Sequence, residues 1–88
     1  MAYKIKFEEN ASRLFDNLDK STQKTIAKFL NRCELTENPR CFGKALQHKL
    51  YGLWRYRIGK YRLIANIQDD ILLILIVGLG KRDKVYDN

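Results

Sequence analysis

Residues 53–64 are the most constraining stretch of this 88-residue chain. Aromatic and aliphatic side chains alternate there with arginines, as in a strand with one buried face, and Gly59-Lys60 interrupts the alternation. A two-residue loop that begins with Gly is typical of a type II′ hairpin turn. The stretch therefore predicts a β-hairpin whose register is fixed by this turn.

The predicted register gives the hairpin one apolar and one cationic face. Counting outward from the turn places Arg57 opposite Arg62, with Arg55 two residues further along the first strand. The other face carries the large apolar side chains that we expect to line the core, namely Trp54, Tyr56, Ile58, Tyr61 and Leu63.

The facing arginines act against folding, because like charges directly opposite on a sheet cost a few tenths to about 1 kcal/mol. One interpretation is a solvated outer face on which salt screens the repulsion. A multi-anionic partner is favoured, because no Asp or Glu occurs from residue 39 to residue 68. The chain has a net charge of +7, and residues 39–88 hold ten Lys or Arg against four Asp or Glu. This distribution is typical of a nucleic-acid binder or of a protein with an acidic partner.

The segments before the hairpin predict a strand at residues 3–7 and a helical hairpin. We expect Asn10 to cap the first helix, and Asp19 or Ser21 to cap a second helix that ends before Pro39. The apolar positions expected to face the core are Ala11, Leu14, Phe15 and Leu18 in the first helix, and Ile26, Phe29, Leu30 and Cys33 in the second.

The segments after the hairpin complete one sheet. The second hairpin strand is expected to run to about Gln68, followed by a two-residue turn at Asp69-Asp70 and an apolar strand at residues 71–79. The predicted fold class is α+β, a single domain over residues 1–88. Its N-terminal strand, helical hairpin and three-stranded antiparallel meander form one four-stranded sheet, with both helices on the Trp54 face. The apolar residues expected on the uncovered arginine face, a candidate binding surface, are Leu73, Leu75 and Val77.

Several kinds of site and location are not indicated by the sequence. Cys33 and Cys41 lack the spacing of metal ligands, so we expect no metal and no cofactor. The longest apolar run is about half of a membrane span, and no signal-like segment opens the sequence. We expect a cytoplasmic protein with reduced thiols and no membrane partner.

The chain resembles the RelE/ParE toxin superfamily of bacterial toxin–antitoxin systems over nearly its whole length. The resemblance is carried by Leu50-x-x-x-Trp54-x-x-Arg57-x-Gly59-x-Tyr61-Arg62-Leu63, by the acidic turn and apolar strand, and by Gly80-Lys81-Arg82-x-x-x-Tyr86. It implies a compact α+β fold and a cognate antitoxin. RelE-type members cleave mRNA in the ribosomal A site, whereas ParE-type members poison gyrase. We expect a ribosome-dependent mRNA endonuclease; a ParE-like gyrase inhibitor, or an inactive member that acts as a binding module, is the alternative.

For the RelE branch, the resemblance implies a catalytic set of Arg55, Arg57, Arg62, Arg82 and Tyr86. Arginine forks match phosphate oxygens, but a guanidinium does not act as a base near pH 7. RelE has lysines at the positions of Arg55 and Arg57, and other RNase members use a Glu and a His. The residue that transfers protons is therefore left open among His48, Lys49, Lys81 and Tyr86.

Two further groups of residues are expected to bind partners. The lysines expected to contact RNA phosphates without reading sequence are Lys44, Lys49, Lys60, Lys81 and Lys84. The apolar residues Leu73, Leu75 and Val77 are expected to bind the antitoxin, because an amphipathic acidic segment could cover them and meet the arginines with carboxylates.

Overall fold

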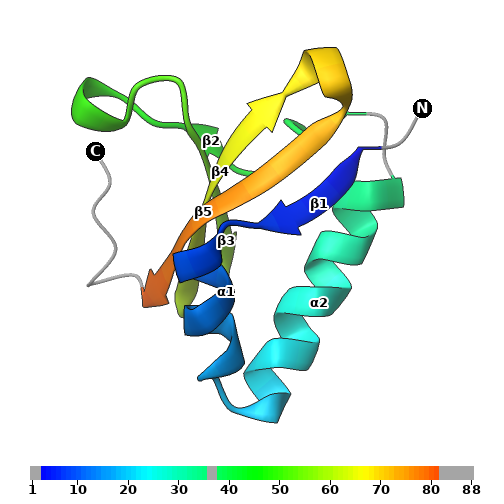
Figure 1. Cartoon of the computed structure of the whole chain (residues 1–88), viewed down its shortest axis with the longest axis vertical. Helices are drawn as coiled ribbons and strands as arrows, with labels where there is room; N and C mark the ends of the chain where they lie inside the picture. Colours follow the sequence, from blue (N-terminus) through cyan, green and yellow to red (C-terminus); the bar gives the residue numbers. More distant parts are fainter. Residues whose placement is uncertain (1–2, 36–37, 82–88) are drawn as a thin grey trace.

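A five-stranded sheet with two helices on one of its faces forms the described part of the chain, residues 3–35 and 38–81 of the computed structural model (Figure 1). The elements in chain order are β1 (Lys4–Phe7), α1 (Glu9–Asp16), α2 (Lys20–Leu35), β2 (Lys44–Ala45), the 3₁₀ helix η1 (His48–Leu50), β3 (Trp54–Ile58), β4 (Tyr61–Gln68), the 3₁₀ helix η2 (Asp69–Ile71) and β5 (Leu73–Lys81). The strand order is β1-β5-β4-β3-β2, and only the β1–β5 pair is parallel. The predicted α+β class is confirmed.

The hairpin formed by β3 and β4 has the predicted register. Arg57 lies opposite Arg62, and Arg55 lies opposite Ile64. Gly59 has a φ of +57°, whereas Lys60 has no positive φ, as a type II′ turn requires. Local turn chemistry alone therefore fixes the central pairing of the sheet.

The sheet has five strands rather than the predicted four, because residues 44–45 pair with β3 as the short edge strand β2. Gly43, just before β2, has a φ of +79°, and a Cβ at this position would lie 2.0 Å from the carbonyl oxygen of Arg55. The indole Nε1 of Trp54 donates a 2.6 Å hydrogen bond to the carbonyl of Phe42. The absence of a side chain at Gly43 thus lets this segment approach β3 closely enough to pair.

The connection between β4 and β5 is longer than predicted. Instead of a two-residue turn at Asp69-Asp70, η2 and Leu72, with a φ of +53°, join the strands, so that Gln68 pairs with Leu73. Further along the pair, Ala65 lies opposite Ile76 but its neighbour Ile64 lies opposite Gly78. Val77, between these two partners, therefore forms a β-bulge. The longer connection keeps the predicted faces of Leu73 and Leu75, whereas Val77 is out of the regular alternation.

The helices begin at acidic caps, one of which differs from the prediction. The carboxylate of Glu8, rather than Asn10, accepts hydrogen bonds from the backbone N–H groups of Asn10 and Ala11. Of the two predicted caps of α2, Asp19 and Ser21, the structure shows Asp19, whose side chain accepts from the N–H and the hydroxyl of Thr22. Leu14, predicted to face the core, is 47% exposed.

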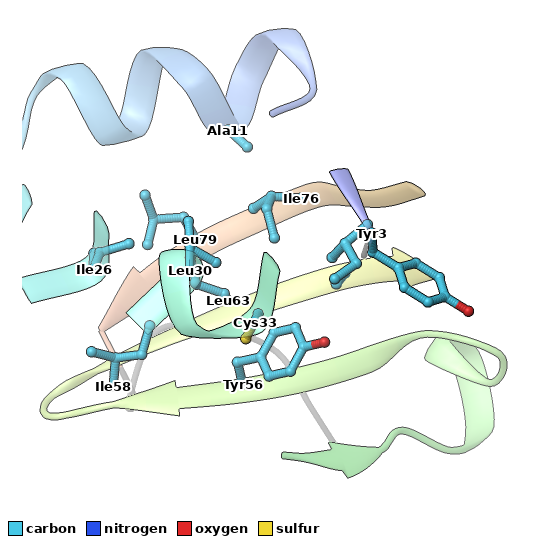
Figure 2. Close-up of a cluster of buried hydrophobic side chains, with 12 residues drawn as sticks. Tyr3, Ala11, Ile26, Leu30, Cys33, Tyr56, Ile58, Leu63, Ile76 and Leu79 are labelled. Atoms are coloured by element: carbon cyan, nitrogen blue, oxygen red, sulfur yellow. The ribbon is translucent and has the colours of Figure 1, made fainter. Parts of the chain in front are cut away.

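The core lies between the helices and the inner face of the sheet (Figure 2). Tyr56, Leu63, Ile74 and Ile76 of the sheet are fully buried, and Ile26 of α2 lies against them. The hydroxyl of Tyr56 donates a 2.6 Å hydrogen bond to the carbonyl of Pro39, and burial raises the pKa of this phenol. The predicted core face of the hairpin is thus confirmed, with Trp54 and Tyr61 only partly buried.

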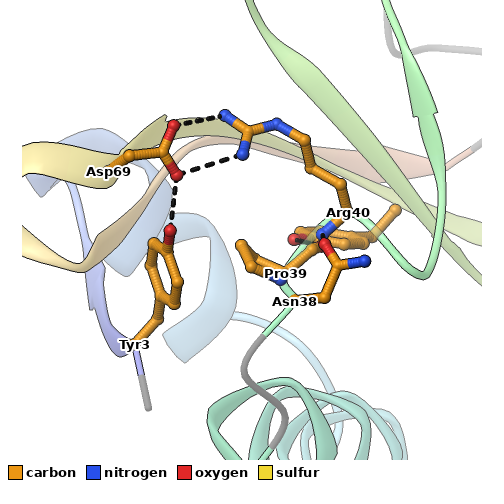
Figure 3. A network of polar contacts seen from close by, with 6 residues as sticks. Tyr3, Asn38, Pro39, Arg40 and Asp69 are labelled. Atoms are coloured by element: carbon orange, nitrogen blue, oxygen red, sulfur yellow. Dashed lines mark hydrogen bonds and ion pairs between the residues drawn. The ribbon is translucent and has the colours of Figure 1, made fainter. Parts of the chain in front are cut away.

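A polar network joins the start of β1, the loop after α2 and the β4–β5 connection (Figure 3). Asp69 accepts two 3.0 Å hydrogen bonds from the Arg40 guanidinium and one of 2.5 Å from the Tyr3 hydroxyl. The hydrogen bonds from Arg40 and, as the second cause, from Tyr3 lower the pKa of Asp69. The hydrogen bond that Tyr3 donates to Asp69 in turn raises the pKa of Tyr3.

Within residues 3–35 and 38–81, no helix is long and apolar enough to cross a membrane.

Candidate functional site

The arginine face is the sheet surface that carries Arg55, Arg57 and Arg62. These arginines alternate along β3 and β4 with core residues, so they lie on the face away from the helices, which cover the other face of the sheet (Figure 1). Arg57 and Arg62 are direct cross-strand partners, whose Cβ atoms are about 5 Å apart in such pairs. Lys44 of β2 is the cross-strand partner of Arg55, so it projects from the same face. Three neighbouring strands therefore bring four cations together, an arrangement that can bind phosphate groups.

Beside the arginines, β5 presents two glycines to the same face. Gly80 is the partner of Arg62, and Gly78 is the partner of Ile64. A Cβ at Gly78 would lie 3.2 Å from the Cβ of Ile64, which is only 5% exposed. Glycine inside a strand often marks the close approach of another group. These two positions were not predicted as part of the site, although their spacing by two residues in an apolar strand is visible in the sequence.

The other predicted site residues on the described chain lie around this cluster rather than in it. Lys60 is exposed in the turn next to Arg57 and Arg62. Lys81 pairs with Tyr61, so it projects from the opposite face of the sheet. His48 and Lys49 are exposed on η1, which precedes the Trp54 end of β3, whereas Arg57 and Arg62 lie at the turn end. In the sequence, η1 therefore leads into the end of β3 that carries Arg55.

The predicted tail residues Arg82, Lys84 and Tyr86 lie outside the described residues.

The apolar residues predicted to bind a partner lie further along the arginine face. Leu73 pairs with Gln68 and Leu75 with Asn66, and both leucines are half-buried. Asn66 is four residues from Arg62 on β4, which corresponds to about 13 Å along the strand. The leucines and the arginines are therefore neighbouring but separate areas of one surface.

An exposed tyrosine beside η1 was not singled out from the sequence. Tyr51 is 83% exposed, and it follows His48 and Lys49 on the loop that leads into β3. His48 itself has a φ of +55°, which a residue with a Cβ adopts rarely. An exposed ring next to cations can stack on an unpaired base. The aromatic residue two positions after Lys49 was the available signal.

Neither cysteine forms part of the site. Cys33 is fully buried in the core, and burial raises the pKa of its thiol to about 11, whereas Cys41 is exposed. No three His, Cys, Asp or Glu side chains within the described ranges are grouped so that they could hold a metal ion.

Comparison with known proteins assigns the chain to a family. The sequence model of the ParE toxin of type II toxin–antitoxin systems (parDE) matches residues 5–86. An Escherichia coli protein named RelE-like toxin protein is 33% identical over 86 residues, which cover 96% of this chain and 87% of that protein. Toxin RelG of Mycobacterium tuberculosis is 28% identical over 86 residues, which cover 98% of both chains.

A solved structure has the same fold over nearly the whole chain. It is the toxin–antitoxin complex RelBE2 from Mycobacterium tuberculosis, which matches with a TM-score of 0.81 and 27% identity over 93% of this chain and all of that one. Family model, sequence relatives and structure agree: the chain belongs to the RelE/ParE toxin superfamily.

Proposed function

We propose that this protein is the toxin of a type II toxin–antitoxin pair and that it inhibits translation as a ribosome-dependent mRNA endonuclease. The observation that carries the proposal is the pairing of Arg57 with Arg62 on a sheet face that also carries Arg55 and Lys44. RNA supplies the closely spaced phosphates that such a cluster can bind. The relatives named RelE-like toxin and RelG support the RelE branch.

The arginines suit one step of RNA cleavage in particular. Attack of a 2′-oxygen on the adjacent phosphorus gives a phosphorane that carries more negative charge than the phosphodiester. The charged forks of Arg57 and Arg62 would stabilise this charge, and Arg55 would help to hold the strand. A second group must take the 2′ proton, and a third must protonate the leaving 5′-oxygen.

Proton transfer requires residues other than the three arginines. On the described chain, His48 and Lys49 are the candidates at the Arg55 end of the face. Arg82 and Tyr86, which the family resemblance adds to the catalytic set, remain candidates for phosphate binding and for acid catalysis. The lysines Lys44 and Lys60 lie where they could hold flanking phosphates.

The proposed protein partner is a cognate antitoxin. The RelBE2 structure is a toxin–antitoxin complex, which supports a partner of this kind. The leucine area at Leu73 and Leu75 adjoins the arginine face, so one amphipathic acidic segment could cover both. Neutralisation and occlusion of the RNA site would then be a single event.

A second candidate function is gyrase inhibition. The matching family model describes ParE toxins, and it covers residues 5–86. In that case the cationic face would bind protein or DNA, and no cleavage chemistry would be needed at the arginines.

The experiment that separates the two functions expresses the toxin briefly and maps mRNA ends by primer extension, beside a gyrase supercoiling assay with purified toxin. The proposal expects new mRNA ends within coding regions, produced in vitro only when ribosomes are present, and unchanged supercoiling activity. Intact mRNA together with inhibited supercoiling would establish the alternative and overturn the endonuclease proposal.

A further inference from the structure

Helix α2 carries a row of four cations that the arginine face does not include. Lys20, Lys24, Lys28 and Arg32 follow one another at intervals of four residues, and all four are exposed. At about 1.5 Å per residue the row is roughly 18 Å long. We call these four residues the α2 row.

The α2 row points away from the core. Ile26 marks the buried side of the helix, and at about 100° per residue Lys24 and Lys28 lie within about 20° of the opposite direction. Because the helices cover one face of the sheet and the arginines lie on the other, the row and the arginine face are on opposite sides of the molecule (Figure 1).

The row is unfavourable for the helix itself. Like charges four residues apart destabilise a helix by about 0.2–0.5 kcal/mol per pair, and the row contains three such pairs in succession. Within residues 3–35 and 38–81, no ion pair involves the row. The only carboxylate of α2 is Glu34, in its last turn.

The C-terminal end of the row is held in place by aromatic rings. The guanidinium carbon of Arg32 lies 5.5 Å from the ring centres of both Phe29 and Phe42. Beside it, a groove of about 500 Å³ between α2 and β3 is lined by Thr25, Lys28, Phe29, Asn31, Arg32 and Ile58. An arginine oriented by stacking loses little freedom when its N–H groups bind phosphate.

We propose that the α2 row docks on the phosphate backbone of ribosomal RNA while the arginine face holds mRNA. This inference rests on the proposed function, because it takes the ribosome as the place of action. Regularly spaced, exposed cations suit a backbone that carries regularly spaced phosphates. An acidic protein partner is less well matched, because the row offers no large apolar anchor among its four members. The toxin would then lie between two RNA surfaces.

The test measures co-sedimentation of the full-length protein with purified ribosomes over a range of salt concentrations. Lys24→Gln/Lys28→Gln should bind ribosomes roughly tenfold more weakly at about 0.1 M salt. The slope of the logarithm of its binding constant against the logarithm of salt concentration should be less steep by about 2, since two phosphate contacts are lost. Lys24→Arg/Lys28→Arg should bind like the wild type. The control compares single substitutions: Arg13→Gln removes one exposed charge of α1 outside the row and away from the arginine face, and it should weaken binding less than Lys24→Gln.

The inference is overturned if Lys24→Gln/Lys28→Gln binds ribosomes like the wild type, or if Arg13→Gln weakens binding as much as Lys24→Gln, which would indicate an effect of net charge alone. It is also overturned if the α2 variant loses only antitoxin affinity. Thermal unfolding of each variant checks that the fold is retained. Row-dependent ribosome binding without mRNA cleavage would refute the proposed endonuclease and leave the docking inference intact. Cleavage of mRNA together with ribosome binding that does not depend on the row would refute the docking inference and leave the proposed endonuclease intact.

Discussion

At the scale of single residues, Arg57 and Arg62 are the side chains on which the proposed chemistry depends most. Removing either fork with Arg57→Ala or Arg62→Ala should lower the rate of mRNA cleavage by about 10²–10³, because one contact to the transition state is lost. The stability should change by less than about 1 kcal/mol, since the substitution also removes a like-charge cross-strand pair.

Toxicity at matched expression and the urea midpoint are the two measurements for these variants. Arg13→Ala is the control, as it removes an exposed arginine of α1 on the helical side, away from the facing pair. Full toxicity of either arginine variant would remove that arginine from the active site.

Asp69 is a residue whose ionisation state affects the fold rather than the chemistry. Its pKa is lowered by Arg40 and Tyr3, so its contribution to stability is present above the ordinary carboxyl pKa and is lost as the pH falls below about 4. Asp69→Asn should therefore make the free energy of unfolding less dependent on pH between about 5 and 3. Denaturant titrations at several pH values measure this, with Asp70→Asn, the next exposed carboxylate of η2, as the control. An unchanged pH profile in Asp69→Asn would contradict the assignment.

At the scale of elements, β2 depends on the close approach permitted by Gly43. Gly43→Ala combines a positive φ with a Cβ 2.0 Å from the Arg55 carbonyl oxygen, and should destabilise the protein by about 2–4 kcal/mol. Gly52→Ala is a matched control, because Gly52 also has a positive φ but has open space around its Cβ position. It should cost only about 1 kcal/mol. Equal losses in the two variants would show that backbone strain, and not contact with β3, sets the effect.

The elements also show which parts of the fold could be predicted from the sequence. The hairpin and the face of each of its residues were predicted correctly, since a two-residue turn and alternating side chains are local signals. The strand β2 was not, because its two residues pair only through a long-range approach at Gly43. The 3₁₀ turn η2 was missed for a similar reason: Asp69 is held by Arg40, 29 residues earlier in the sequence.

The candidate site, like the fold, could be predicted from the sequence only in part. The grouping of Arg55, Arg57 and Arg62 follows from the hairpin register, and the structure adds Lys44 through β2. The cross-strand pairing of Gly80 with Arg62 could not be predicted from the sequence, because it depends on the length of the β4–β5 connection and on the bulge at Val77. The alternation of apolar and polar side chains alone does not determine the register of two strands that are joined by an irregular connection.

At the scale of the whole molecule, the leucine area and the arginine face together form the surface proposed to bind the antitoxin. Leu73→Ser/Leu75→Ser should weaken antitoxin binding roughly 30- to 300-fold, because two apolar anchors are lost from one interface. Isothermal titration with the purified antitoxin measures the change. Leu14→Ser is the control, since it makes the same exchange at an exposed position of α1 on the helical side. Unchanged affinity in the double variant would place the antitoxin elsewhere.

The position of β5 has a consequence for when the protein can act during its own synthesis. β5 lies between β1 and β4 in the sheet, although it is the last of the described strands to be translated, and it supplies Ile74, Ile76 and Leu79 to the core. A nascent chain that ends before Leu73 lacks the strand that joins β1 to β4 and on which α1 packs, so β1 has no partner in the sheet. Such a truncated chain should show no cooperative unfolding by circular dichroism. Under the proposed function, strand order would keep the toxin inactive on the ribosome that makes it until β5 has emerged.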